Sequence, residues 1–301
     1  MNISTNNGIS EAKTPIQPVE LNIGQDVLRG ILREPRQNRY PNHCILFLAG
    51  PGTTRCGPHR LNWEIAERIA QLGLRSFRFD YRGRGESSGQ EDNLDVESMY
   101  EDAVWCYNAL TRSFPLLQQI IIIAVCMGAI SGIKLMESNP HVCDGIFLGA
   151  PRYIPKVPMA EKFQYSKYMM NKYLAKVLHR ETWKRIIENK VDYMAVVRTL
   201  FGQYQKYVPQ YRDKDNLLNV IRSRMTLEDK SSNTEKQLLF VYGQYDPAKI
   251  GCMRFYRKFC KMKGWRYKAL EINKSDRTFN NHKAVRKVAE IICNHILSIC
   301  S

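Results

Sequence analysis

Two kinds of hydrophobic pattern alternate along the chain. Residues 44–48, 120–125, 144–148 and 238–242 are almost entirely apolar, which is typical of strands buried on both faces of a parallel sheet. Residues 61–72, 95–112, 128–137 and 249–263 repeat apolar residues at helical spacing. Shorter strands are expected at 75–80 and 267–272, and a last helix, capped by Asn280, is expected to end near residue 299. The alternation predicts an α/β fold with a mostly parallel sheet and helices on both faces.

Three segments depart from this alternation. Residues 1–18 are polar and are predicted to be a flexible N-terminus, whereas 20–23 and 27–33, on either side of Gly24-Gln-Asp26, predict an antiparallel hairpin. Residues 152–236 contain helical patterns and no convincing strand. An insertion after the carboxyl end of a strand covers that edge of the sheet, so we predict a helical cap there. The predicted core is therefore residues 19–151 and 237–301.

The strongest chemical signal follows the strand at 120–125. The sequence Ala124-Val-Cys126-Met-Gly128 places small residues two positions either side of a cysteine, at a strand-to-helix turn. Such a nucleophile elbow exposes the side chain above the sheet edge. It also brings Cys126 and the backbone N–H of Met127 to the positive end of a helix, which favours a thiolate and an oxyanion. The alternative is a buried cysteine that packs as a small hydrophobic residue.

Two further strand ends carry candidate groups. The strand at 44–48 ends in Ala49-Gly50-Pro51-Gly52, where Gly50 is the expected second oxyanion donor because Pro51 has no N–H. The same sequence also suits a simple turn. The strand at 238–242 leads to Gly243-Gln-Tyr-Asp246, and a carboxylate at this position can orient a catalytic base.

Composition bears on the cellular location of the protein. No apolar run approaches the roughly 20 residues that span a bilayer, and the N-terminal residues lack the pattern of a signal peptide. Nine cysteines without CxxC spacing favour free thiols over disulfides or a zinc site, so we expect a cytoplasmic protein without a membrane span. No nucleic-acid-binding motif is present, and no metal or cofactor is indicated.

The chain is strongly basic. It holds 45 Lys and Arg residues against 29 Asp and Glu, a formal net charge of +16. Residues 152–236 alone hold 18 Lys and Arg against 9 Asp and Glu, a net of +9. This surplus would attract an acidic partner, or it serves solubility alone.

These motifs together resemble the α/β-hydrolase superfamily over nearly the whole chain. The resemblance rests on the elbow, the Gly50-Pro51 turn, the exit Asp80-Tyr-Arg-Gly83 and the later Gly243-x-x-Asp246. Within the superfamily the chain is similar to the hydrolase 1 proteins associated with the exosortase A (PEP-CTERM) system, which also carry a cysteine at the elbow. Supporting stretches include Gly57-Pro-His59-Arg60. The resemblance implies that Cys126 is the nucleophile.

The sequence departs from that family at one position. Where the family has Asp-His-Thr-Phe, with the catalytic histidine, this chain has Asp276-Arg277-Thr278-Phe279, and arginine cannot act as a base. Three readings follow. His282 replaces the base beside Asp246; or Arg277 stabilises a Cys126 thiolate or binds an anionic group of the substrate; or catalysis is lost and the fold only binds.

We expect an acyltransferase or thioesterase that forms an acyl-Cys126 intermediate from a thioester. A weak base favours transfer to an amine or alcohol over hydrolysis. The basic cap would attract an acidic acyl carrier protein or the phosphates of coenzyme A. The alternatives are a simple ester or thioester hydrolase that uses Cys126, His282 and Asp246, and a non-catalytic acyl-binding scaffold.

Overall fold

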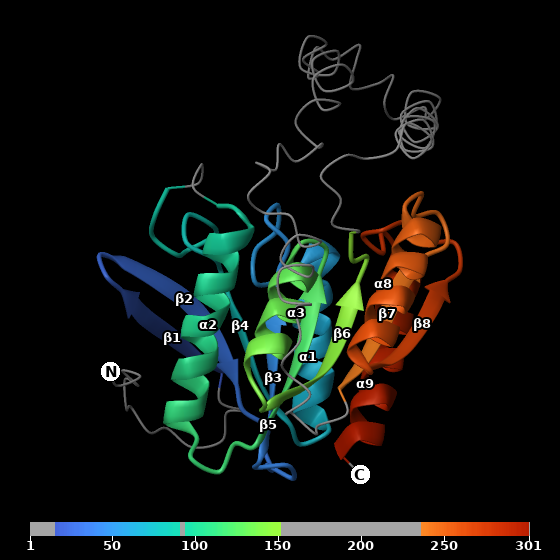
Figure 1. Ribbon diagram of the computed structural model, residues 1–301. Coiled ribbons are helices and arrows are strands. Elements are labelled where there is room, and N and C mark those ends of the chain that lie inside the picture. Colours follow the sequence, from blue (N-terminus) through green and yellow to red (C-terminus); the bar gives the residue numbers. More distant parts are fainter. Residues whose placement is uncertain (1–15, 91–93, 152–235, 301) are drawn as a thin grey trace, which may run out of the picture. The chain divides into compact units, whose positions relative to one another are not determined.

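The computed structural model describes residues 16–90, 94–151 and 236–300, and these residues are built around an eight-stranded sheet (Figure 1). The strand order is β1-β2-β4-β3-β5-β6-β7-β8. The strands are β1 (Ile16–Ile23), β2 (Asp26–Arg33), β3 (His43–Leu48), β4 (Arg75–Phe79), β5 (Gln119–Val125), β6 (Val142–Leu148), β7 (Gln237–Gly243) and β8 (Arg266–Ile272). The helices are η1 (Pro58–Arg60), α1 (Leu61–Gln71), α2 (Val96–Ser113), α3 (Gly128–Ser138), α8 (Lys249–Lys263) and α9 (His282–Cys300).

The sheet is mostly parallel, which confirms the predicted fold class. Strands β1 and β2 form an antiparallel hairpin, β2 runs antiparallel to β4, and all later neighbours pair in parallel. Helices α1 and α9 pack together on one face, and α2 and α3 pack together on the other (Figure 1). In this arrangement, the carboxyl ends of β3, β5, β6 and β7 lie at one edge of the sheet, where the candidate chemical groups follow.

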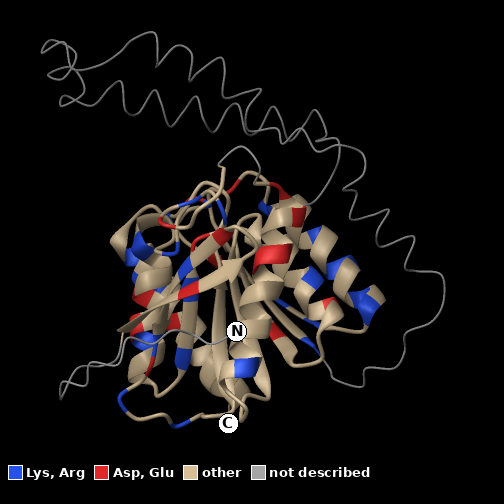
Figure 2. Cartoon of the chain, turned by 90° about the vertical axis from the view of Figure 1, so that its left-hand side faces the viewer, with Lys and Arg blue, Asp and Glu red and all other residues tan. Residues whose placement is uncertain are grey.

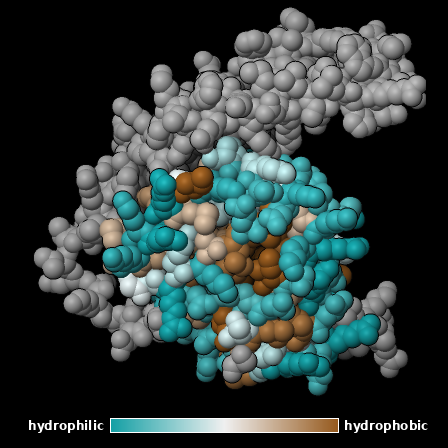
Figure 3. All heavy atoms as spheres, turned by 90° about the vertical axis from the view of Figure 1, so that its right-hand side faces the viewer, coloured by the Kyte–Doolittle hydropathy of each residue, from teal (hydrophilic) through white to brown (hydrophobic). Residues whose placement is uncertain are grey.

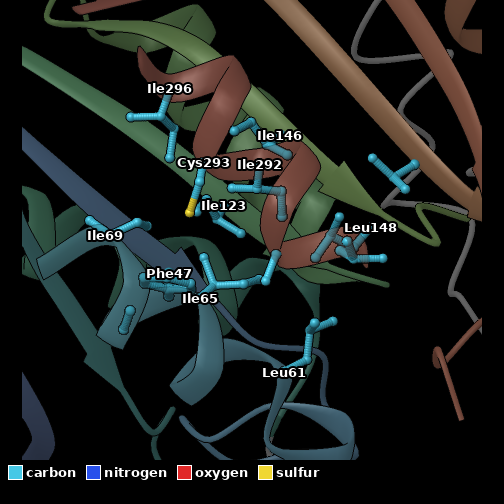
Figure 4. Close-up of a cluster of buried hydrophobic side chains, with 14 of the residues drawn as sticks. Phe47, Leu61, Ile65, Ile69, Ile123, Ile146, Leu148, Ile292, Cys293 and Ile296 are labelled. Carbon is cyan, nitrogen blue, oxygen red and sulfur yellow. The ribbon is translucent and has the colours of Figure 1, made fainter. Parts of the chain in front are cut away.

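The core lies between the sheet and the pair of helices α1 and α9. Ile65 and Ile69 project from one helix and Ile292 and Ile296 from the other, at the i, i+4 spacing of a single helix face (Figure 4). They meet strand residues such as Ile123, which is fully buried. Burying one such side chain contributes roughly 1.5–3 kcal/mol, so this layer holds the central strands firmly in place.

Two boundaries differ from the sequence prediction. Strand β1 begins at Ile16, inside the segment predicted to be flexible, because pairing of Ile16 with Arg33 extends the hairpin to its full length. The last helix is capped by Asn281 and not by Asn280. The backbone N–H of Ala284 donates to Asn281 Oδ1 at 2.8 Å, because the helix starts only at His282.

The predicted cap, residues 152–236, falls outside the described residues except for Lys236 and stays a prediction. Within the described ranges, no helix combines the length and the apolarity that a membrane crossing needs.

Charged residues of both signs are interspersed on the side that Figure 2 shows. Ion pairs within the described residues include Arg29 with Glu20 and Arg33 with Glu67. The opposite side, where β8 forms the edge of the sheet, exposes hydrophobic residues within a mainly hydrophilic surface (Figure 3).

Candidate active site

Cys126 lies at the sharp turn between β5 and α3. Its φ of +51° is in the left-handed region, which costs a non-glycine residue roughly 1–2 kcal/mol. The turn is held by hydrogen bonds in both directions: the Cys126 N–H donates to the Leu148 carbonyl at 2.9 Å, and its own carbonyl accepts from the Ala129 N–H at 3.1 Å. A Cβ at Gly128 would lie 2.5 Å from the Leu48 carbonyl oxygen, so only glycine fits there. The strand, turn and helix therefore have the geometry of an elbow.

Two backbone segments adjoin the cysteine. Met127 follows it at the N-terminus of α3, and a backbone hydrogen bond from Met127 favours the Cys126 thiolate. Gly50 lies directly against it, because a Cβ on Gly50 would be 3.3 Å from Cys126 Cβ. The Gly50 carbonyl accepts the N–H of Thr53 at 3.1 Å. The use of these two N–H groups as an oxyanion hole stays a prediction.

Asp246 follows β7, and its carboxylate is completely buried. One oxygen, Oδ1, accepts the backbone N–H of Ala248 at 3.0 Å, and the other, Oδ2, accepts Arg277 Nε–H at 3.0 Å. The carboxylate therefore orients a side chain, although the prediction was that it orients a base. The side chain that it orients is an arginine.

Arg277 belongs to the loop between β8 and α9. The loop is fixed by Asp276, whose Oδ1 accepts both the backbone N–H and the hydroxyl of Thr278, at 2.9 and 2.8 Å. It also lies tightly against two glycines, one at the end of β7 and one directly after β6. A Cβ on Gly149 would be 2.9 Å from Arg277 Cγ, and one on Gly243 would be 2.1 Å from the Asp276 carbonyl oxygen. The loop thus brings Arg277 next to Asp246, with its side chain 32% exposed.

The electrostatics of the three side chains are coupled. Burial raises the pKa of the Cys126 thiol, and the Arg277 guanidinium and the Met127 N–H oppose that rise without cancelling it. Burial alone would lower the pKa of Arg277, but the Asp246 carboxylate and the Cys126 thiolate outweigh it and raise the pKa. Arg277 therefore stays charged beside Cys126, and most Cys126 is a neutral thiol near pH 7.

His282, the predicted replacement base, is exposed at the first position of α9. Within the described part of the chain, it makes no hydrogen bond or ion pair with Cys126, Asp246 or Arg277. The structure thus brings together three of the four candidate side chains. In the ranges that the structure describes, no group of three His, Cys, Asp or Glu side chains could hold a metal ion.

Two structural contributors were not identified from the sequence as parts of the site. Gly149 makes room for Arg277, and its signal was a glycine directly after the strand at 144–148. Asp80 is buried and accepts the backbone N–H of Arg55 at 2.6 Å, while also pairing with the Arg55 side chain. It thereby ties the loop that follows Gly50 to the end of β4. The sequence feature that could have identified Asp80 is an acidic residue at the end of a mainly apolar strand.

Comparisons with known proteins agree with this architecture. The sequence model of one family, serine aminopeptidase S33, matches residues 60–248. The fold is similar to that of the esterase Pf2001 from Pyrococcus furiosus, with a TM-score of 0.60 and 16% identity over 96% of each chain. It is also similar to Est1E from Butyrivibrio proteoclasticus, with ferulic acid bound (TM-score 0.58, 14% identity, 93% of this chain and 98% of that chain).

A third similar structure is an alpha-beta serine hydrolase homologue from Coxiella burnetii, with a TM-score of 0.54 and 12% identity over 98% of this chain and 99% of that chain. No curated protein sequence matches the chain. At these identities the structural likeness concerns the fold.

Proposed function

Since the chain belongs to the serine aminopeptidase S33 family and has the α/β-hydrolase fold, we propose that it is an acyl-transfer enzyme that forms an acyl-Cys126 intermediate from a thioester. One observation carries the proposal. The buried Asp246 carboxylate holds Arg277, which cannot accept a proton, beside a cysteine that needs no strong base to react. Among the described residues of this site, a serine would find no base to deprotonate it.

The first step exchanges one thioester for another. The Cys126 thiol first releases its proton to water. The thiolate then attacks the carbonyl carbon, an S–C bond forms, and the carbonyl electrons move to an oxyanion near the N–H groups of Met127 and Gly50. Collapse of this intermediate breaks the bond to the leaving thiol, which departs as a thiolate and takes a proton from water. Negative charge is conserved throughout, and Arg277 is positioned to stabilise it.

The second step distinguishes transfer from hydrolysis. Water must lose a proton as it attacks the acyl-cysteine, and the described site holds no base for it. A neutral amine is already nucleophilic, and its proton can leave after attack while the Cys126 thiolate departs. The site therefore favours amine acceptors over water. The likeness to exosortase-associated hydrolases with an elbow cysteine also supports nucleophilic use of Cys126.

The proposed acyl donor is a thioester of an acidic carrier protein or of coenzyme A. The surplus of Lys and Arg, 45 against 29 Asp and Glu, supports an anionic partner. Charge reversal at Lys172, Lys176 and Arg180 should weaken carrier-protein binding, and more strongly at low salt. Carrier affinity that is unchanged in this triple variant would remove the carrier from the proposal.

Intact-protein mass spectrometry tests the covalent step. The protein is incubated with acetyl, butyryl and octanoyl thioesters of N-acetylcysteamine, and each should add the mass of its acyl group. The adduct should be absent in Cys126→Ala and retained in His282→Ala, because His282 does not contact the cysteine. An adduct that survives in Cys126→Ala places the reaction elsewhere. No adduct and no turnover would leave a binding protein with an acylation-inert cysteine.

A designed gain of function tests the missing base. Arg277→His places an imidazole between Asp246 and Cys126, so hydrolysis of the acyl-enzyme should accelerate and free acid should accumulate. The wild-type protein should keep its acyl group longer in the absence of an amine. Equal deacylation rates in the two proteins would contradict the assignment of Arg277 to the position of the base.

A further inference from the structure

The guanidinium of Arg277 has one occupied edge and one open end. Its Nε–H donates to Asp246 Oδ2 at 3.0 Å, whereas Nη1 and Nη2 donate to nothing in the part of the chain that the structure describes. The side chain is 32% exposed, so this open end is reachable from outside. Arg277 is therefore held as a ligand-binding arginine would be, with its direction fixed and its two parallel donors unused.

The surroundings fix that direction further. Gly149 contacts both Cγ and the carbonyl oxygen of Arg277, since a Cβ there would lie 2.9 Å from each. Asp276 and Thr278 hold the backbone on either side. A planar guanidinium held in this way loses little side-chain entropy when it binds a ligand. A carboxylate is the group that matches two parallel N–H donors, through bidentate hydrogen bonds.

The same guanidinium acts electrostatically on Cys126, and the thiolate raises the pKa of Arg277. The backbone geometry also brings the two residues close together: the Cys126 N–H donates to the Leu148 carbonyl at 2.9 Å, and Gly149, the next residue, lies against Arg277 Cγ. A carboxylate bound there belongs on the acyl chain, close to the thioester carbonyl. Leaving-group phosphates, at the far end of a long pantetheine arm, would not reach it.

We propose that Arg277 is a specificity residue that selects acyl groups carrying a second carboxylate, the monothioesters of short dicarboxylic acids. This inference rests on the proposed formation of an acyl-Cys126 intermediate. It adds a substrate class to that function. The charge of Arg277 would then bind the substrate carboxylate in addition to stabilising the Cys126 thiolate.

A competition experiment tests the selection. The protein receives equal amounts of the malonyl and 3-methylbutanoyl thioesters of N-acetylcysteamine, which have the same number of heavy atoms in the acyl group and differ in charge. Intact mass gives the ratio of the two acyl-enzymes. We expect malonyl to be favoured by about 10-fold or more, as charge-assisted bidentate recognition allows. High salt should reduce the ratio.

Two variants separate recognition from folding. The double variant Asp246→Asn/Arg277→Gln keeps a neutral hydrogen-bonding pair, and its fold is checked by circular dichroism. Its malonyl preference should fall to about 1. Arg277→Lys keeps the positive charge but loses the two parallel N–H donors of the guanidinium, so it should retain only a small part of the malonyl preference. Arg286→Gln, an exposed arginine on α9, is the matched control and should keep the wild-type ratio.

The outcomes are distinguishable. A wild-type protein that is acylated by both thioesters at equal rates overturns the selection and leaves the acyl-cysteine proposal standing. A preference that survives in the double variant also overturns the role of Arg277. Failure of every thioester to acylate Cys126 overturns the proposed function, and the selection with it.

Discussion

The ion pair between Asp246 and Arg277 is unequally buried, and its two halves should respond differently to mutation. The Asp246 side chain is 0% exposed and that of Arg277 is 32% exposed. Arg277→Leu leaves a buried carboxylate whose one remaining hydrogen-bond partner among the described residues is the Ala248 N–H, which costs about 3–5 kcal/mol. Asp246→Asn leaves a guanidinium that water can reach, and the new amide oxygen can still accept its hydrogen bond, so we expect a cost of about 1 kcal/mol.

Urea unfolding followed by circular dichroism measures both free energies. For Arg277→Leu the melting temperature should also fall, by roughly 6–12 °C. The double variant Asp246→Asn/Arg277→Leu should recover much of the loss, because the orphaned charge is gone. Lys287→Leu is the matched control: its partner Glu290 is 54% exposed, so the change should stay within about 0.5 kcal/mol. Equal costs for the two single variants, or a larger cost for Asp246→Asn, would refute the reasoning.

Three further predictions concern the scaffold. Burial raises the pKa of Cys44 from 9.0 to about 12, and it raises the pKa of buried Cys260 to about 12 as well. The folded protein therefore keeps these two thiols protonated at a pH where the unfolded chain releases their protons. The contribution of each thiol to the free energy of unfolding is complete below pH 9 and is lost as the pH rises toward 12, by about 1.4 kcal/mol per thiol at pH 10. Urea unfolding free energies that stay constant from pH 8 to 10.5 would contradict this prediction. Gly243→Ala should cost more than about 3 kcal/mol, because its Cβ would lie 2.1 Å from a backbone carbonyl oxygen of the loop after β8. Gly52→Ala, which meets nothing within 4 Å, should be nearly neutral in the same unfolding assay. Asn281→Ala should cost about 1 kcal/mol by removing the cap of α9, while Asn280→Ala should change little; thermal melts of the two variants decide whether the cap is assigned correctly.

The central strands were predictable because their burial on both faces shows as an apolar run in their own sequence. Strand β5 is apolar along almost its whole length, since it is covered on both faces and flanked by β3 and β6. The start of β1 was not predictable in this way. Pro18 opposes a strand in an isolated reading, yet it is tolerated here because β1 pairs only with β2 and forms the edge of the sheet.

The site residues that directly follow strands could be predicted from the sequence. The residue contributed by the loop after β8 could not, because its position depends on the path of that loop. Cys126 and Asp246 follow strands of one parallel sheet, which brings them to the same edge. The side chain that meets Asp246 depends on the course of the loop after β8. Buried Phe279, with a φ of +56°, turns that loop before His282, so that the histidine begins a helix at the surface. The local sequence around His282 does not predict this turn.

The position of β5 also has a consequence for the lifetime of the site. Its amides bond to neighbours on both sides and its isoleucines are fully buried, so they should be among the last to exchange with deuterium. Partial openings that release the edge strands β1 or β8 would leave β5 closed. The strained turn at Cys126 is joined directly to this slow-exchanging strand. Its geometry should therefore survive most local unfolding events, and be lost only when the whole domain unfolds.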